Sequence, residues 1–92
     1  MGLIDYRKVA DFIKAFSHPV RLMIVAELLK EEKCVSDIKE LVSVRQSNIS
    51  QHLAVLRSRG IVDWHQKGNM KCYFLKNPTL VKSIIGKFIN GK

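Results

Sequence analysis

The segment VRQSNISQHLAVLRSRGIV, residues 44–62, concentrates short hydrogen-bonding side chains at its start and carries two arginines near its end. Amide and hydroxyl groups both donate and accept hydrogen bonds, and Gln or Asn can pair in bidentate fashion with adenine in the major groove of DNA. If the segment is helical, its polar residues fall on one arc, opposite an apolar stripe. The arc holds Ser47, Asn48, Gln51 and the small Ala54, and the stripe holds Ile49, Leu53 and Leu56. Such a helix can pack by one side and read base edges with the other.

Basic residues surround this segment. Six Lys and Arg residues lie between Val44 and Lys76, against one acidic residue, Asp63, and the whole chain has 16 Lys and Arg against eight Asp and Glu, for a formal charge of +8. A solvated outer face would also be polar, but a basic stripe beside such a helix is typical of phosphate binding. The candidate DNA contacts are Arg45, Gln46, Ser47, Asn48, Ser50, Gln51, His52, Arg57, Arg59, Lys67, Asn69 and Lys71. His52 lies at the margin of the apolar stripe, where packing is as compatible with its position as a phosphate contact.

The sequence before this segment predicts three helices. Apolar residues at helical spacing indicate a helix over about residues 5–16 and a second one that ends in the charged run KEEK. Ser17 can cap the second helix, and Pro19 is harmless in its first turn. Ser36 can cap a short third helix, which would turn Ile38 and Leu41 inward. The residues around Cys34 predict a short strand or extended link.

The remaining sequence predicts the fourth helix, a hairpin and a last helix. The fourth helix is expected from Ser47 to about Arg59, with Gly60 as its stop. The runs IVDWHQ and KCYFLK alternate like strands around KGNM, whose Gly-Asn pair suits a tight turn. In the last helix, Asn77 can cap and Pro78 takes the first position. The fold class is therefore α+β, mainly α: one domain over residues 1–92, a winged helix-turn-helix with five helices and a two-stranded wing hairpin.

Composition excludes several classes of protein. The longest apolar runs are far too short to span a membrane, and the first residues do not resemble a signal peptide, so we expect a cytoplasmic protein that does not associate with membranes. A C-x-x-C pair, a Gly-rich phosphate loop and a nucleophile with an identifiable base are all missing, so the chain is not expected to be an enzyme or to hold a cofactor. It also lacks the aromatic platform that single-strand RNA binders use.

At these residues the sequence resembles the ArsR family of winged-helix repressors. AFSHPVRLMIVAELL is similar to the second-helix signature of the family, CVSDIKELVSVRQSNISQHLAVLRSRGIV to its recognition block, and KGNMKCYFLKN to its wing. The resemblance covers nearly the whole chain. It implies a sequence-specific DNA-binding regulator, a repressor that binds a palindromic operator as a homodimer and releases it when an inducer binds. A winged-helix module that binds a protein instead of DNA is the alternative.

The resemblance also implies that the first and last helices form the dimer interface. The last helix has more apolar surface than a chain of 92 residues can cover by itself, although the monomer core accounts for some of it. A two-fold dimer would place its recognition helices about 34 Å apart, one turn of DNA. The interface candidates are Val9, Phe12, Ile13, Ile84, Ile85, Phe88 and Ile89.

The inducer is left open between a small molecule, a redox signal and a metal. Many relatives carry a CVC thiolate site at the start of the third helix, whereas this chain has Cys34, Val35 and Ser36, and the hydroxyl is a poor ligand for soft metals. The last helix carries none of the His and carboxylate ligands that other relatives use there, so no metal site is expected. In a winged helix the strand before the third helix pairs with a wing strand, which would bring Cys34 close to Cys72. Inert packing and a redox response are both compatible with that pair.

Overall fold

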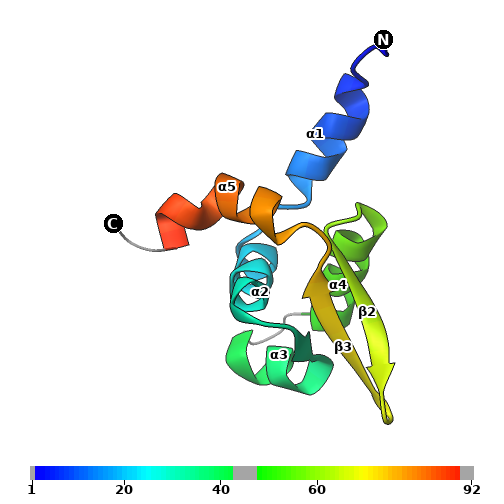
Figure 1. Ribbon diagram of the computed structural model, residues 1–92, viewed down its shortest axis with the longest axis vertical. Coiled ribbons are helices and arrows are strands. Elements are labelled where there is room, and N and C mark those ends of the chain that lie inside the picture. Colours follow the sequence, from blue (N-terminus) through cyan, green and yellow to red (C-terminus); the bar gives the residue numbers. More distant parts are fainter. Residues whose placement is uncertain (1, 43–47, 90–92) are drawn as a thin grey trace.

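The computed structural model describes residues 2–42 and 48–89, which form five helices and three strands (Figure 1). In chain order these are α1 (Tyr6–Lys14), α2 (Pro19–Lys30), β1 (Lys33–Cys34), α3 (Val35–Val42), α4 (Ile49–Ser58), β2 (Val62–Lys67), β3 (Met70–Leu75) and α5 (Pro78–Ile89). Helices α2, α3 and α4 lie together beside the hairpin, while α1 projects away from them. The predicted winged helix-turn-helix with five helices is confirmed.

The sheet has three antiparallel strands in the order β1-β3-β2: the predicted two-stranded wing and the short strand expected around Cys34. This short strand, β1, pairs with the central strand so that Cys34 lies opposite Cys72. Strands β2 and β3 pair from Val62 opposite Leu75 to Lys67 opposite Met70. Between them Gly68 takes a φ of 63°, in the left-handed region, which is open to glycine at little cost and closes the tight turn.

The core lies between helices α2, α3 and α4 and one face of the sheet. Its fully buried members include Ile24, Ile38, Leu53 and Leu56. Leu41, predicted to face inward, is instead 50% exposed. Ile38 and Val42 take the inner face of α3 because residues four apart lie on the same side of a helix.

Side chains cap several helices, and one of the three predicted caps, Asn77, is confirmed. Ser36, the predicted cap of the third helix, lies inside α3, which begins at Val35. Asp5 accepts a hydrogen bond from the backbone of Lys8 at the start of α1, and Asn77 accepts one from Leu80 in α5. The predicted cap of α2 was wrong by one residue: His18 Nδ1 accepts the Val20 N–H at 3.1 Å. Ser17 instead donates to a backbone carbonyl of α1.

Helix α4 begins later than predicted. Its first residue is Ile49 and Asn48 is its N-cap, whereas Ser47, the predicted start, lies outside the described residues. Gly60, with φ of 74°, ends the helix as expected. None of the helices in the described part of the chain is long and apolar enough to cross a membrane.

Candidate nucleic-acid interface

The outer edge of α4 is polar and exposed, as the helical wheel predicts. Asn48, Ser50, Gln51 and Ala54 are exposed, whereas Ile49, Leu53 and Leu56 are buried. The cap orders two of the amides, because Asn48 Oδ1 accepts the Gln51 backbone N–H and Asn48 Nδ2 donates to Gln51 Oε1, both at 3.1 Å. The two side chains are therefore held side by side at the N-terminus of the helix, where the dipole favours negative charge.

An open groove of about 720 Å³ separates α3 and α4 from the wing. Ser50, Ala54 and Arg57 line its α4 side, and Asn69 and Lys71 line its wing side. The groove thus brings together predicted contacts from two parts of the chain. The opposite wall adds Lys39 of α3, which the sequence did not single out.

Trp64 organises the cations of this groove. Lys71 Nζ lies 4.4 Å from the centre of its ring and the Arg57 guanidinium lies 5.5 Å away, within the range of cation–π attraction. Arg57 Nε also donates to Asp63 Oδ1 at 3.0 Å. The backbone N–H of Trp64 and the Arg57 side chain both hydrogen bond to Asp63 and hold the pKa of its carboxyl below the usual value. Both cations are therefore oriented by β2 while they remain on the surface.

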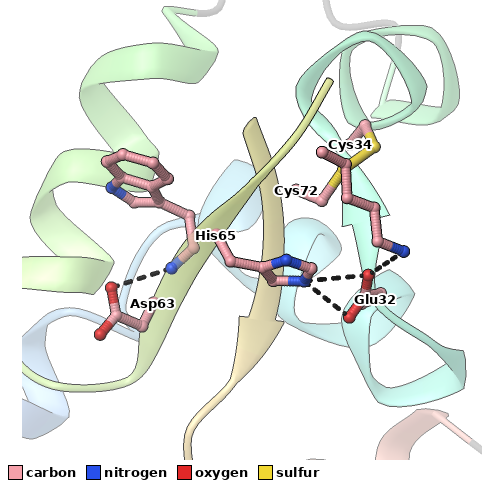
Figure 2. A network of polar contacts seen from close by, with 7 residues as sticks. Glu32, Cys34, Asp63, His65 and Cys72 are labelled. Atoms are coloured by element: carbon pink, nitrogen blue, oxygen red, sulfur yellow. Dashed lines mark hydrogen bonds and ion pairs between the residues drawn. A yellow bond between two sulfur atoms is a disulfide. The ribbon is translucent and has the colours of Figure 1, made fainter. Parts of the chain in front are cut away.

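The remaining predicted cations are partly engaged within the chain. Arg59, at the C-cap of α4, lies 3.9 Å from a carboxylate oxygen of Asp11. Lys67 Nζ lies 2.7 Å from Glu32 Oε2, and His65 Nε2 lies 3.1 Å from both oxygens of Glu32 (Figure 2). Both hydrogen bonds lower the pKa of the Glu32 carboxyl, and the one from Lys67 has the larger effect. No sequence pattern indicates this contact of Glu32, which lies 33 residues before His65.

His52 does not lie with the other candidates. Its ring packs against that of His18 with the ring centres 4.3 Å apart, on the side of α4 that meets α2. Its Nδ1 is buried without a hydrogen-bond partner among the described residues. Burial lowers the pKa of His52, and the nearby His18 and Arg21 lower it further. The packing alternative describes this residue better than a phosphate contact. Three more candidates, Arg45, Gln46 and Ser47, lie outside the described residues.

The predicted dimer residues form an exposed apolar surface on α1 and α5, with two exceptions. Val9, Ile13, Ile84 and Ile89 are exposed, and Phe88 is 83% exposed. Ile85, in contrast, is only 7% exposed because α5 packs that side of the helix onto the core. Phe12 is half-buried, with its ring 5.5 Å from that of Phe16.

The two cysteines meet as expected from the pairing of β1 with the wing. Cys34 and Cys72 are joined by a disulfide across β1 and β3 (Figure 2). Cys72 is fully buried and Cys34 is half-buried. Across residues 2–42 and 48–89, no group of three His, Cys, Asp or Glu side chains is arranged to hold a metal ion.

Helices α3 and α4 are followed by a hairpin, and a basic groove lies between the helices and the hairpin. This arrangement defines a winged helix-turn-helix of the kind that regulates transcription. The sequence model of a family described as "Bacterial regulatory protein, arsR family" matches residues 18–63. The chain belongs to the ArsR family of bacterial regulatory proteins, which confirms the family that its sequence resembles.

Relatives with known names support the same class. The chain is 39% identical over 69 residues to the biofilm growth-associated repressor of Xylella fastidiosa, covering 75% of this chain and 59% of the relative. It is 38% identical over 74 residues to the cadmium resistance regulator CadC of Listeria innocua, covering 79% and 62%. The chain thus spans about three-fifths of the length of these relatives.

Solved structures share the fold along nearly the whole chain. The transcriptional repressor BigR of Xylella fastidiosa superposes with a TM-score of 0.74 at 35% identity, covering 90% of this chain and 88% of BigR. HlyU of Vibrio cholerae superposes with a TM-score of 0.80 at 31% identity, covering 94% and 92%.

Proposed function

We propose that this chain is a repressor that binds a palindromic operator as a homodimer. The observation that carries the proposal is the exposed polar edge of α4 beside a groove lined by Arg57 and Lys71. Amides at the start of α4 supply base-specific hydrogen bonds, and the cations of the groove supply contacts to phosphate. The excess of positive charge on the chain supports the same partner.

Gln51 and Lys71 have different roles in this proposal. Gln51 lies at the N-terminus of α4, where side chains of a recognition helix reach base edges. Lys71 lies on the wing with its ammonium over Trp64, where it can meet a phosphate but does not face the bases that α4 would read. Substituting the first should change which sequences are bound, and substituting the second should weaken binding to all of them.

A gel-shift assay on the DNA upstream of the gene for this chain, at several salt concentrations, tests these roles. Gln51→Ala should reduce the preference for the specific site over random DNA by about 1–3 kcal/mol. Lys71→Ala should weaken both and lower the salt slope by about 1 per subunit. Glu40→Gln, an exposed position on α3 outside the groove, is the matched control and should change neither. Retention of full site preference by Gln51→Ala would contradict the proposed reading edge.

The exposed apolar surfaces of α1 and α5 support the homodimer. None of the residues of α1 is buried in the single chain, although Val9 and Ile13 are apolar. Contiguous exposed apolar residues are typical of an interface. Phe88→Asp should therefore shift the mass measured by light scattering from the dimer to the monomer, since a charge would be buried without a partner. Lys87→Asp changes the neighbouring exposed residue and should shift it less. A wild-type chain that is monomeric at all concentrations would refute the dimer.

A further inference from the structure

The outer face of the wing sheet carries a disulfide and an ion cluster that the groove does not use. Alternate residues of a strand point to opposite faces. The register therefore places Cys34, Cys72 and His65 on one face of the sheet, and Trp64 with Lys71 on the face toward the groove. Lys67, two residues after His65, shares the face of the disulfide.

Glu32 connects this face to the charge of the wing. It lies one residue before β1 and reaches across the central strand to two residues of β2, contacting Lys67 Nζ at 2.7 Å and His65 Nε2 at 3.1 Å. The contact with Lys67 neutralises a cation that the sequence places among the candidate phosphate contacts. The position of β1 therefore controls the net charge of the wing near its turn.

The disulfide is the strongest connection between β1 and the rest of the sheet. The strand has two residues, Lys33 and Cys34, so its ladder offers few hydrogen bonds. Helix α3, which follows directly, is held independently because Ile38 and Val42 are buried in the core. Breaking the disulfide should therefore free β1 and Glu32 while α3 and α4 remain in place.

We propose that the Cys34–Cys72 bond is a redox switch for DNA affinity, which rests on the proposed function of the groove and wing. In the oxidised protein, the bond holds Glu32 against Lys67 and weakens DNA binding. In the reduced protein, Glu32 moves away and Lys67 is available to a phosphate. Each recovered phosphate contact releases about 0.9 counterion, which corresponds to about a fivefold gain in affinity per subunit at 0.15 M salt.

The chemistry of the switch is thiol–disulfide exchange with a dithiol reductant. A thiolate of the reductant attacks the half-buried Cys34 Sγ, the sulfur–sulfur bond breaks, and Cys72 leaves as a thiolate that takes up a proton. The second thiol of the reductant then displaces Cys34, so the protein gains two protons and two electrons and the reductant becomes a disulfide. A peroxide reverses the reaction: the Cys34 thiolate is oxidised to a sulfenic acid, which condenses with the Cys72 thiol and releases water.

The test compares DNA binding by the full chain in dithiothreitol and after oxidation with hydrogen peroxide, with thiol labelling to report the redox state. On a random-sequence duplex, the reduced protein should bind about fivefold more tightly per subunit, with a salt slope steeper by about 0.9 per subunit. Circular dichroism on both forms keeps a loss of folding distinct from a loss of contact. The salt slope distinguishes the two explanations, because loosening of the fold alone would change the affinity without adding a phosphate contact and would leave the slope unchanged.

Three variants separate the switch from general effects of oxidation. Glu32→Gln removes the charge that neutralises Lys67, so its oxidised form should bind as tightly as its reduced form. Glu31→Gln is the matched control, because Glu31 is the adjacent acid but contacts Lys33 at 3.8 Å and not Lys67, so the redox difference should persist. Cys34→Ser should bind like the reduced wild type in peroxide.

Equal affinity and equal salt slope in the two forms would overturn the switch, as would tighter binding by the oxidised form or a full redox difference in Glu32→Gln. Each of these results leaves the proposed function intact, because the protein still binds DNA. Absence of binding to any duplex in both forms would instead overturn the proposed function and the switch together.

Discussion

Reduction of the Cys34–Cys72 bond should lower the free energy of unfolding by about 4 kcal/mol. The bond joins residues separated by 38 positions, and the loop that it closes contains α3, β2 and α4, the helix proposed to read base edges. In the chain-entropy model, closing a loop of this length removes about 13 cal/mol/K from the unfolded chain, which amounts to about 4 kcal/mol at 25 °C. A small domain has only about 5–15 kcal/mol of stability in total. The reduced protein should therefore fold with a much smaller margin.

Urea denaturation followed by circular dichroism, with and without dithiothreitol, measures this difference. With a urea slope of about 2 kcal/mol/M, the midpoint should fall by about 2 M on reduction. Both series need the same protein concentration, because the stability of a dimer depends on it. Cys34→Ser should unfold near the midpoint of the reduced wild type and should not respond to dithiothreitol. A midpoint that moves by less than about 0.5 M at an unchanged slope would refute the loop-closure reasoning.

Three further predictions concern α4. Leu53→Ala should lower the free energy of unfolding by about 2–5 kcal/mol in chemical denaturation, because Leu53 is fully buried, whereas the exposed Leu41→Ala should change it by less than about 0.5 kcal/mol. Asn48→Ala should cost about 1 kcal/mol in the same assay through loss of the N-cap, and Asn48→Asp should retain most of it. The pKa of His52 is lower in the folded chain than its ordinary value of 6.5, so the unfolded chain takes up the proton first and the free energy of unfolding should fall as the pH drops below about 6.5. In urea titrations at several pH values, the free energy of unfolding of His52→Gln should depend less on pH than that of the wild type. An unchanged pH dependence would contradict the assignment to His52.

The features that sequence predicts well are those encoded by local spacing. The prediction of which residues of α4 are buried was correct, because the spacing of Ile49, Leu53 and Leu56 puts them on one face of a helix whatever that helix packs on. The prediction that Asn77 caps α5 was correct, because a short side-chain acceptor just before Pro78 can accept a backbone N–H of the first turn without help from the rest of the fold. Both depend on neighbours in the chain.

The predictions that were wrong concern features that depend on how helices and strands pack on one another. Leu41 and Val42 are both apolar and lie three and four residues after Ile38, so the packing of α3 on α2 decides which of them is buried. Ile85 belongs to the apolar face of α5, but the packing of α5 on α2 places it in the core and leaves Phe88 outside. Lys67 is a basic residue near a turn, and its ion pair requires that β1 lies beside β3, which brings Glu32 within reach of β2. Periodicity alone carries none of this information.

The pleat of the hairpin places the proposed DNA contacts and the proposed redox switch on different faces of the sheet. Trp64 and Lys71 point to the groove, while His65, Lys67 and Cys72 belong to the opposite face, so neighbouring residues of one strand serve different surfaces. A substitution at Trp64 should disturb the orientation of Arg57 and Lys71 and leave the contact of Glu32 with Lys67 unchanged. Conversely, Glu32→Gln alters the outer face and leaves the groove as it is. The two faces share the backbone of β2 and β3. In the proposal, Lys67 connects them, because its ion pair with Glu32 on the outer face decides whether it is available to a phosphate of the DNA.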